Sequence, residues 1–88
     1  MPDKAVMLEL KDLKRSRQQY EIWRAEREAS KKELAEQQLS DAQKEQLSPE
    51  EVENIELQKN ESLKAIDTEL EAQKEVDVKN QERVKELQ

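Results

Sequence analysis

Among the side chains of this sequence, the carboxylates and the serines are those that could take part in catalysis. The chain has 22 Asp and Glu residues but no His and no Cys. Without His, no imidazole is available to activate a serine, and carboxylates alone rarely form the tetrahedral sites that zinc prefers. Gly is also absent, whereas phosphate-binding loops and EF-hand loops require it. We therefore expect no catalytic residue, no cofactor and no metal site.

The basic stretch of residues 11–32 could bind nucleic acid. It holds eight Lys and Arg against four Asp and Glu, and it contains Tyr20 and Trp23, which are the only aromatic residues. Cationic and aromatic side chains together are typical of surfaces that bind single strands. Residues 48–88, however, carry twelve acidic and six basic side chains, so the basic stretch could instead face this acidic half in the same or another copy. We favour this second interpretation, because the net charge of −6 repels phosphate.

A protein contact is the more specific expectation for the same stretch. Tyr20 and Trp23 are one helical turn apart and should touch the same neighbour. Ile22, Ala25 and Ala29 project about 160° away from the main apolar stripe at 100° per residue, and a helix that is apolar on two sides is usually sandwiched between neighbours. We therefore predict a partner-binding site made of Tyr20, Ile22, Trp23, Ala25, Arg27 and Ala29.

The elements that position these residues should all be helices. Charged residues make up 43% of the chain and aromatic residues 2%, and its abundant Glu, Lys, Gln, Ala and Leu favour helices and coiled coils. The lack of Gly removes the residue on which tight strand-to-strand turns depend. We therefore predict an all-α fold.

The clearest helix start lies at residues 47–52. Ser48 can cap the helix, Pro49 suits its first position, and Glu51 completes a capping box. A second possible box begins at Ser40, so a short helix at about residues 41–46 is expected within an elbow. We predict one domain over residues 1–88, an antiparallel helical hairpin or coiled coil with a first arm of about 3–38, an elbow of 39–48 and a second arm of about 49–87. The alternative is one extended, nearly continuous helix.

The apolar residues of the two arms recur at helical spacing and predict a seam between them. The hairpin model places Leu39 near Val52 and Tyr20 near Leu70. Polar side chains interrupt the seam on both arms, so we expect it to be shallow and self-association or a partner helix to supply the missing burial. The predicted seam residues are Leu10, Leu13, Leu34, Leu39, Val52, Ile55, Leu63, Ile66, Leu70, Val84 and Leu87.

Together these features predict a non-catalytic interaction or assembly protein that acts through helix–helix contacts, of the adaptor, scaffold, chaperone-like or virion accessory type. Two alternatives are a nucleic-acid-binding protein that uses residues 11–32 and an acidic inhibitor that binds a basic cleft. The first five residues contain no basic n-region and begin no long apolar run. We therefore expect neither a signal peptide nor a membrane span, and a soluble protein of the cytoplasm.

Overall fold

The computed structural model describes residues 3–88, and this range contains three helices and no strand. Helix α1 comprises Lys4–Glu36, α2 comprises Asp41–Glu45 and α3 comprises Pro49–Leu87. The predicted all-α class is confirmed for these residues. Residues 1 and 2 lie outside the described residues. They belong to the predicted domain and to the stretch on which the predicted lack of a signal peptide rests.

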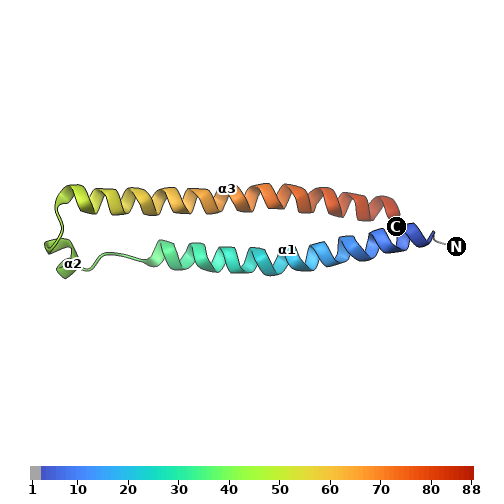
Figure 1. The fold of residues 1–88 in the computed structure, drawn as a ribbon, viewed down its shortest axis with the longest axis horizontal. Coiled ribbons are helices and arrows are strands. Elements are labelled where there is room, and N and C mark those ends of the chain that lie inside the picture. The colour runs from blue at the N-terminus through green and yellow to red at the C-terminus, as the bar shows by residue number, and fades with distance from the viewer. Residues whose placement is uncertain (1–2) are drawn as a thin grey trace.

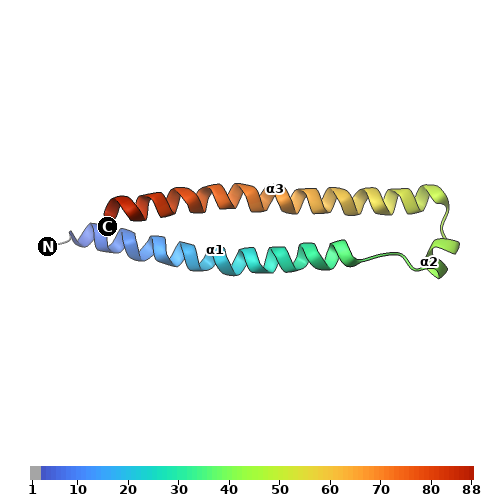
Figure 2. The ribbon, with the colours of Figure 1, turned by 180° about the vertical axis from the view of Figure 1, so that it is seen from behind.

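The two long helices lie side by side and run in opposite directions (Figures 1 and 2). Helix α2 lies at one end of the molecule, and the start of α1 and the end of α3 lie together at the other end. The resulting shape is narrow, with extents of 71 × 16 × 14 Å. Nearly every side chain of such a two-helix arrangement is close to solvent.

Polar caps begin all three helices. The side chain of Asp3 accepts a hydrogen bond from the backbone N–H of Ala5. The capping box predicted at Ser48 is present: its hydroxyl accepts from the N–H of Glu51 at 3.1 Å, and the Glu51 carboxylate accepts from the N–H of Ser48 at 3.2 Å. Ser40 forms the same box with Gln43 at the start of α2. These caps satisfy backbone donors that the first turn of a helix leaves without partners.

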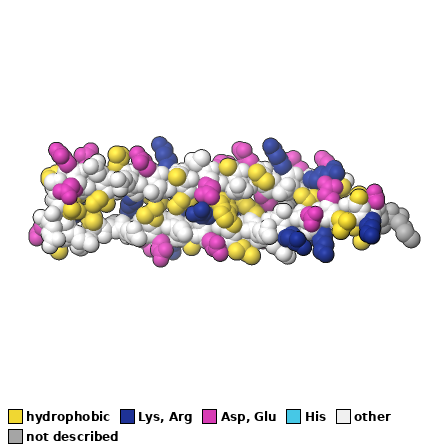
Figure 3. Space-filling model, in the orientation of Figure 1, with side chains coloured by type: hydrophobic (Ala, Val, Ile, Leu, Met, Phe, Trp, Pro, Cys, Tyr) yellow, Lys and Arg dark blue, Asp and Glu magenta, His cyan; other side chains and the backbone are white. Residues whose placement is uncertain are grey.

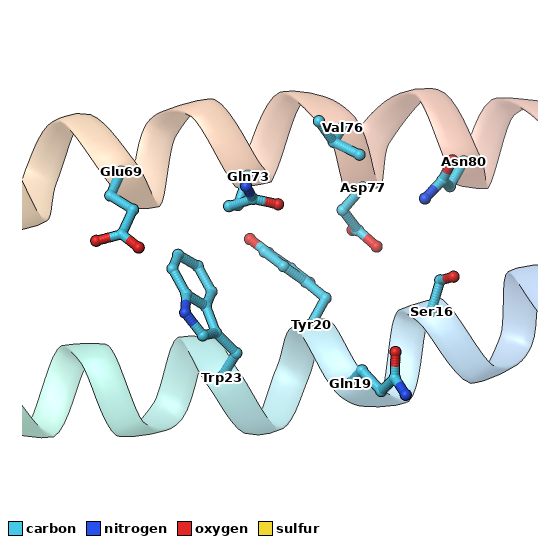
Figure 4. Close-up of a pocket in the computed structure, with 9 residues that line it drawn as sticks. All are labelled: Ser16, Gln19, Tyr20, Trp23, Glu69, Gln73, Val76, Asp77 and Asn80. Carbon is cyan, nitrogen blue, oxygen red and sulfur yellow. The ribbon is translucent and has the colours of Figure 1, made fainter.

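The pairing of the two long helices is displaced from the expected one by about a helical turn. Leu39 shares a surface hollow with Ile55 and Lys59, which follow Val52 along α3, and Tyr20 lies by Gln73 and Asp77, which follow Leu70 (Figure 4). Helix α1 ends two residues earlier than expected, and residues 37–40 are extended. An extended residue advances about 3.3 Å and a helical residue only 1.5 Å. The connection therefore runs beside the first turns of α3 and moves the start of α3 beyond the end of α1.

Burial is shallow along the whole contact. Among the described residues no apolar side chain is buried, and Asp77, 6% exposed, is the only buried residue. Many apolar side chains gather along the line between the helices, and many charged ones lie along the outer edges (Figure 3). Ile55 is exposed at 40%, because the extended connection leaves this part of α3 less covered than α1 would. The other predicted seam residues are half-buried: Leu10, Leu13, Leu34, Leu39, Val52, Leu63, Ile66, Leu70, Val84 and Leu87.

Candidate interaction site

Four side chains of α1 form a continuous stack on the side that faces α3. The rings of Tyr20 and Trp23 have centroids 6.3 Å apart and planes inclined by 31°. The guanidinium of Arg17 lies 5.9 Å from the Tyr20 centroid, and that of Arg27 lies 5.9 Å from the Trp23 centroid. Both distances fall within the range of cation–π attraction. We call these four residues the arginine–aromatic ladder.

Helix α3 supplies acidic partners for both ends of the ladder. Arg17 donates a hydrogen bond to the carboxylate of Asp77, and Arg27 donates one to Glu69 at 3.4 Å. Tyr20 and Trp23 project from α1 toward α3, and Gln73 faces them (Figure 4). An open hollow of about 410 Å³ remains here. It is lined by Ser16, Gln19, Tyr20, Trp23, Glu69, Gln73, Val76, Asp77 and Asn80.

Arg17 and Asp77 form the most enclosed ion pair within residues 3–88. Asp77 is 6% exposed, whereas the side chain of Arg17 is 41% exposed and also pairs with Glu21 at 3.2 Å. A carboxylate removed from water needs a charged partner, and Arg17 is that partner. Both residues interrupt the apolar stripes of their helices, but the sequence analysis did not predict that they pair. Their opposite charges could have indicated it, since charged interruptions of opposite sign in two antiparallel stripes can neutralise each other.

Two more ion pairs connect α1 with α3. Lys31 lies 2.5 Å from the carboxylate of Asp67, and near the termini Arg83 of α3 donates to both oxygens of Glu9 at 2.7 and 3.2 Å. Three of the eight cations in residues 11–32 thus pair with carboxylates of α3. This pattern is the one expected if the basic stretch faces the acidic helix of the same chain.

The contact near the termini also changes the acidity of its members. The hydrogen bond from Arg83 lowers the pKa of the Glu9 carboxyl below its ordinary value, and desolvation opposes this in part. The hydrogen bonds that Arg83 donates to Glu9 and to Glu86 raise the pKa of its guanidinium. Both groups therefore stay charged at neutral pH.

The six residues of the predicted partner-binding site lie on two different sides of α1. Tyr20, Trp23 and Arg27 are half-buried against α3. The remaining three, which we call the outer strip, are Ile22, Ala25 and Ala29. All three are exposed, and the side chain of Ile22 is 63% exposed. Helical spacing puts the outer strip on the side of α1 opposite α3.

Comparison with known proteins finds no match for this chain. No protein-family model, curated protein or solved structure matches the chain. Within residues 3–88, no cluster of His, Cys, Asp and Glu side chains is arranged to hold a metal ion. None of the helices formed by those residues combines the length and the apolar character needed to cross a bilayer.

Proposed function

We propose that the chain is a non-catalytic interaction protein, an antiparallel helical hairpin that associates with itself or with partner helices. Exposed apolar surface is the observation that carries this proposal. Within residues 3–88, seven large apolar side chains are between 40% and 63% exposed, namely Met7, Leu8, Ile22, Ile55, Leu57, Val76 and Val78. Association with another helix would bury part of this surface and stabilise the fold.

The polar contacts within the chain support the hairpin part of the proposal. The seam is held at both ends and in its middle by ion pairs rather than by a deep apolar core. Exposed ion pairs contribute only about 0–1 kcal/mol each, so they orient the helices more than they stabilise them. A fold with well-defined orientation and modest stability is suited to binding partners along its length.

The proposal is tested by measuring molar mass and helicity over a wide range of concentrations. Self-association predicts a mass above the 10.4 kDa of one chain at high concentration, and a melting temperature that falls on dilution because association stabilises the folded state by mass action. A monomer mass and an unchanged melting temperature down to sub-micromolar concentration would contradict self-association.

Retention on immobilised DNA tests the alternative that the chain binds nucleic acid. Binding that uses the cations of residues 11–32 would decline steeply as salt is added, because counterions are released from the phosphates. We expect no retention at physiological salt, since three of those cations already have carboxylate partners on α3. Strong, salt-sensitive retention would overturn the proposal.

A further inference from the structure

We infer that the occupant of the outer strip is a second copy of this chain, whose own α1 lies antiparallel to the first. This inference rests on the proposed function and names the partner and its orientation. The exposed apolar side chain of Ile22 would lie over the small Ala25 and Ala29 of the second copy, and the reverse contact would form at the same time. Such a reciprocal contact is an isologous two-fold interface.

The outer strip continues into charged residues of opposite sign at its two ends. Arg15, Ile22, Ala29 and Glu36 are spaced seven residues apart, so they follow one side of the helix with a drift of about 20° per step. All four are exposed. Neither Arg15 nor Glu36 forms an ion pair with another residue in the described range 3–88. The strip therefore has a basic end, an apolar centre and an acidic end.

The remaining charges of α1 show the same asymmetry. We exclude the four residues of α1 that pair with α3, which are Glu9, Arg17, Arg27 and Lys31. The half of α1 up to residue 18 then carries four cations against one acid, Lys4, Lys11, Lys14 and Arg15 against Asp12. The half from residue 19 onward carries five acids against two cations, Glu21, Glu26, Glu28, Glu33 and Glu36 against Arg24 and Lys32. The outward charge of α1 is thus +3 in one half and −3 in the other.

This asymmetry selects the partner and the orientation. Two antiparallel copies of α1 place each positive half over a negative half, whereas two parallel copies place like charges together and repel. An antiparallel arrangement that packs Ile22 against Ala29 of the second copy also brings Arg15 opposite Glu36 of that copy. The small side chains of Ala25 and Ala29 permit the close approach of about 8–10 Å between axes that packed helices adopt. One surface therefore provides both halves of a complementary interface.

A charge in the centre of the strip is the first test. Ile22→Asp should raise the dissociation constant of the self-associated form by about tenfold or more, because an unpaired charge in a desolvated contact is costly. Ala65→Asp is the matched control, since Ala65 is also an exposed apolar residue but belongs to α3 and lies outside the surface proposed to associate. It should leave the dissociation constant unchanged. Circular dichroism of both variants at one concentration reports whether the helices remain.

Charge reversal tests the orientation. Arg15→Glu and Glu36→Arg should each weaken self-association by about three- to tenfold, because two exposed attractive pairs become repulsive. An equimolar mixture of the two variants should recover the wild-type dissociation constant, since both pairs between unlike chains are again attractive. In a parallel arrangement position 15 faces position 15 and position 36 faces position 36, so each reversal alone replaces one like-charged pair by another. Single variants that associate as the wild type does would therefore contradict the antiparallel orientation.

Cross-linking provides an independent measurement, because the chain has no native Cys. A short bismaleimide should join Arg15→Cys chains to Glu36→Cys chains in a mixture and should join neither variant to itself. Cross-linking of Arg15→Cys to itself would overturn the antiparallel orientation. Self-association that is unaffected by Ile22→Asp and by both charge reversals would overturn this interface alone. A wild-type chain that is monomeric at every concentration would overturn both this inference and the self-association on which it rests.

Discussion

Asp77 shows how one polar residue can determine the pairing of two helices. It lies in the apolar stripe of α3 and is the only buried residue of the described range. Shifting α3 by one turn along α1 would move its carboxylate away from Arg17 and leave it buried without a cation. The energetic cost of that state is larger than the benefit of the ion pair itself. We interpret the pair as a determinant of register, at some expense of stability.

Substitutions at this pair should have unequal effects on the free energy of unfolding. Arg17→Leu leaves the Asp77 carboxylate enclosed without a cation and should cost about 2 kcal/mol. Asp77→Leu should cost less than about 1 kcal/mol, because the side chain of Arg17 is 41% exposed to water and keeps its ion pair with Glu21. Urea denaturation at neutral pH and one fixed protein concentration measures both.

The double variant completes the comparison. Arg17→Leu combined with Asp77→Leu should be at least as stable as the wild type, because replacing a buried ion pair by apolar side chains is often neutral or stabilising. Equal losses for the two single variants, or a double variant less stable than Arg17→Leu, would contradict the role assigned to Asp77.

The pair of Glu9 and Arg83 predicts a pH dependence. Arg83 lowers the pKa of Glu9 in the folded state, so the pair contributes stability above the ordinary pKa of a glutamate, about 4.3. That contribution is lost as the pH falls through the lowered pKa. Glu9→Gln should therefore melt below the wild type at pH 7, and the difference should vanish in acid.

The control for this effect is Glu61→Gln on α3, which removes a carboxylate that has no ion pair within residues 3–88. It should show no comparable difference between pH 7 and acid. A Glu9→Gln variant whose melting temperature stays below the wild type by the same amount at both pH values would contradict the assignment.

At the scale of elements, local signals in the sequence predict where helices begin better than where they end. Ser40 and Ser48 each carry a capping box, and both boxes can be read from four consecutive residues. The end of α1 has no such marker: Gln37 follows it in an extended conformation, although Gln favours helices. The extended residues 37–40 then displaced the register, which no local pattern specifies. Helical spacing already separates Ile22 from the main apolar stripe, but only the position of α3 shows that Trp23 is half-buried against that helix while Ile22 is exposed.

The cap at Ser48 can be tested alone. Ser48→Ala removes the hydroxyl that accepts from the N–H of Glu51 and should lower the free energy of unfolding by about 1 kcal/mol. Ser30→Ala is the control, because Ser30 is exposed within α1. It should be neutral or slightly stabilising, since Ala is the better helix former. Similar urea midpoints for the two variants would show that the cap does not stabilise α3.

At the scale of the whole molecule, the proposed association bears on how the two long helices of one chain pair. The 71 × 16 Å outline leaves a large surface for the number of residues, and the described chain buries only one polar side chain. Two chains could satisfy the same α1–α3 contacts by exchanging helices, with the connection of residues 37–48 opened. A two-fold contact through the outer strip leaves each hairpin intact, whereas exchange separates α1 from its own α3. The two arrangements have the same mass but different distances within one chain.

A distance within one chain separates the hairpin from these alternatives. Spin labels at Leu13→Cys and Val76→Cys should lie within about 20 Å, since α1 and α3 are neighbours and packed helix axes are about 8–10 Å apart. One continuous helix would separate them by 63 residues at 1.5 Å each, roughly 95 Å. In an excess of unlabelled chain, each labelled molecule pairs with an unlabelled one. If the chains exchange helices, the two labels of one chain are then far apart and the short distance is lost. We expect the short distance to persist in this mixture, and its loss would contradict the hairpin.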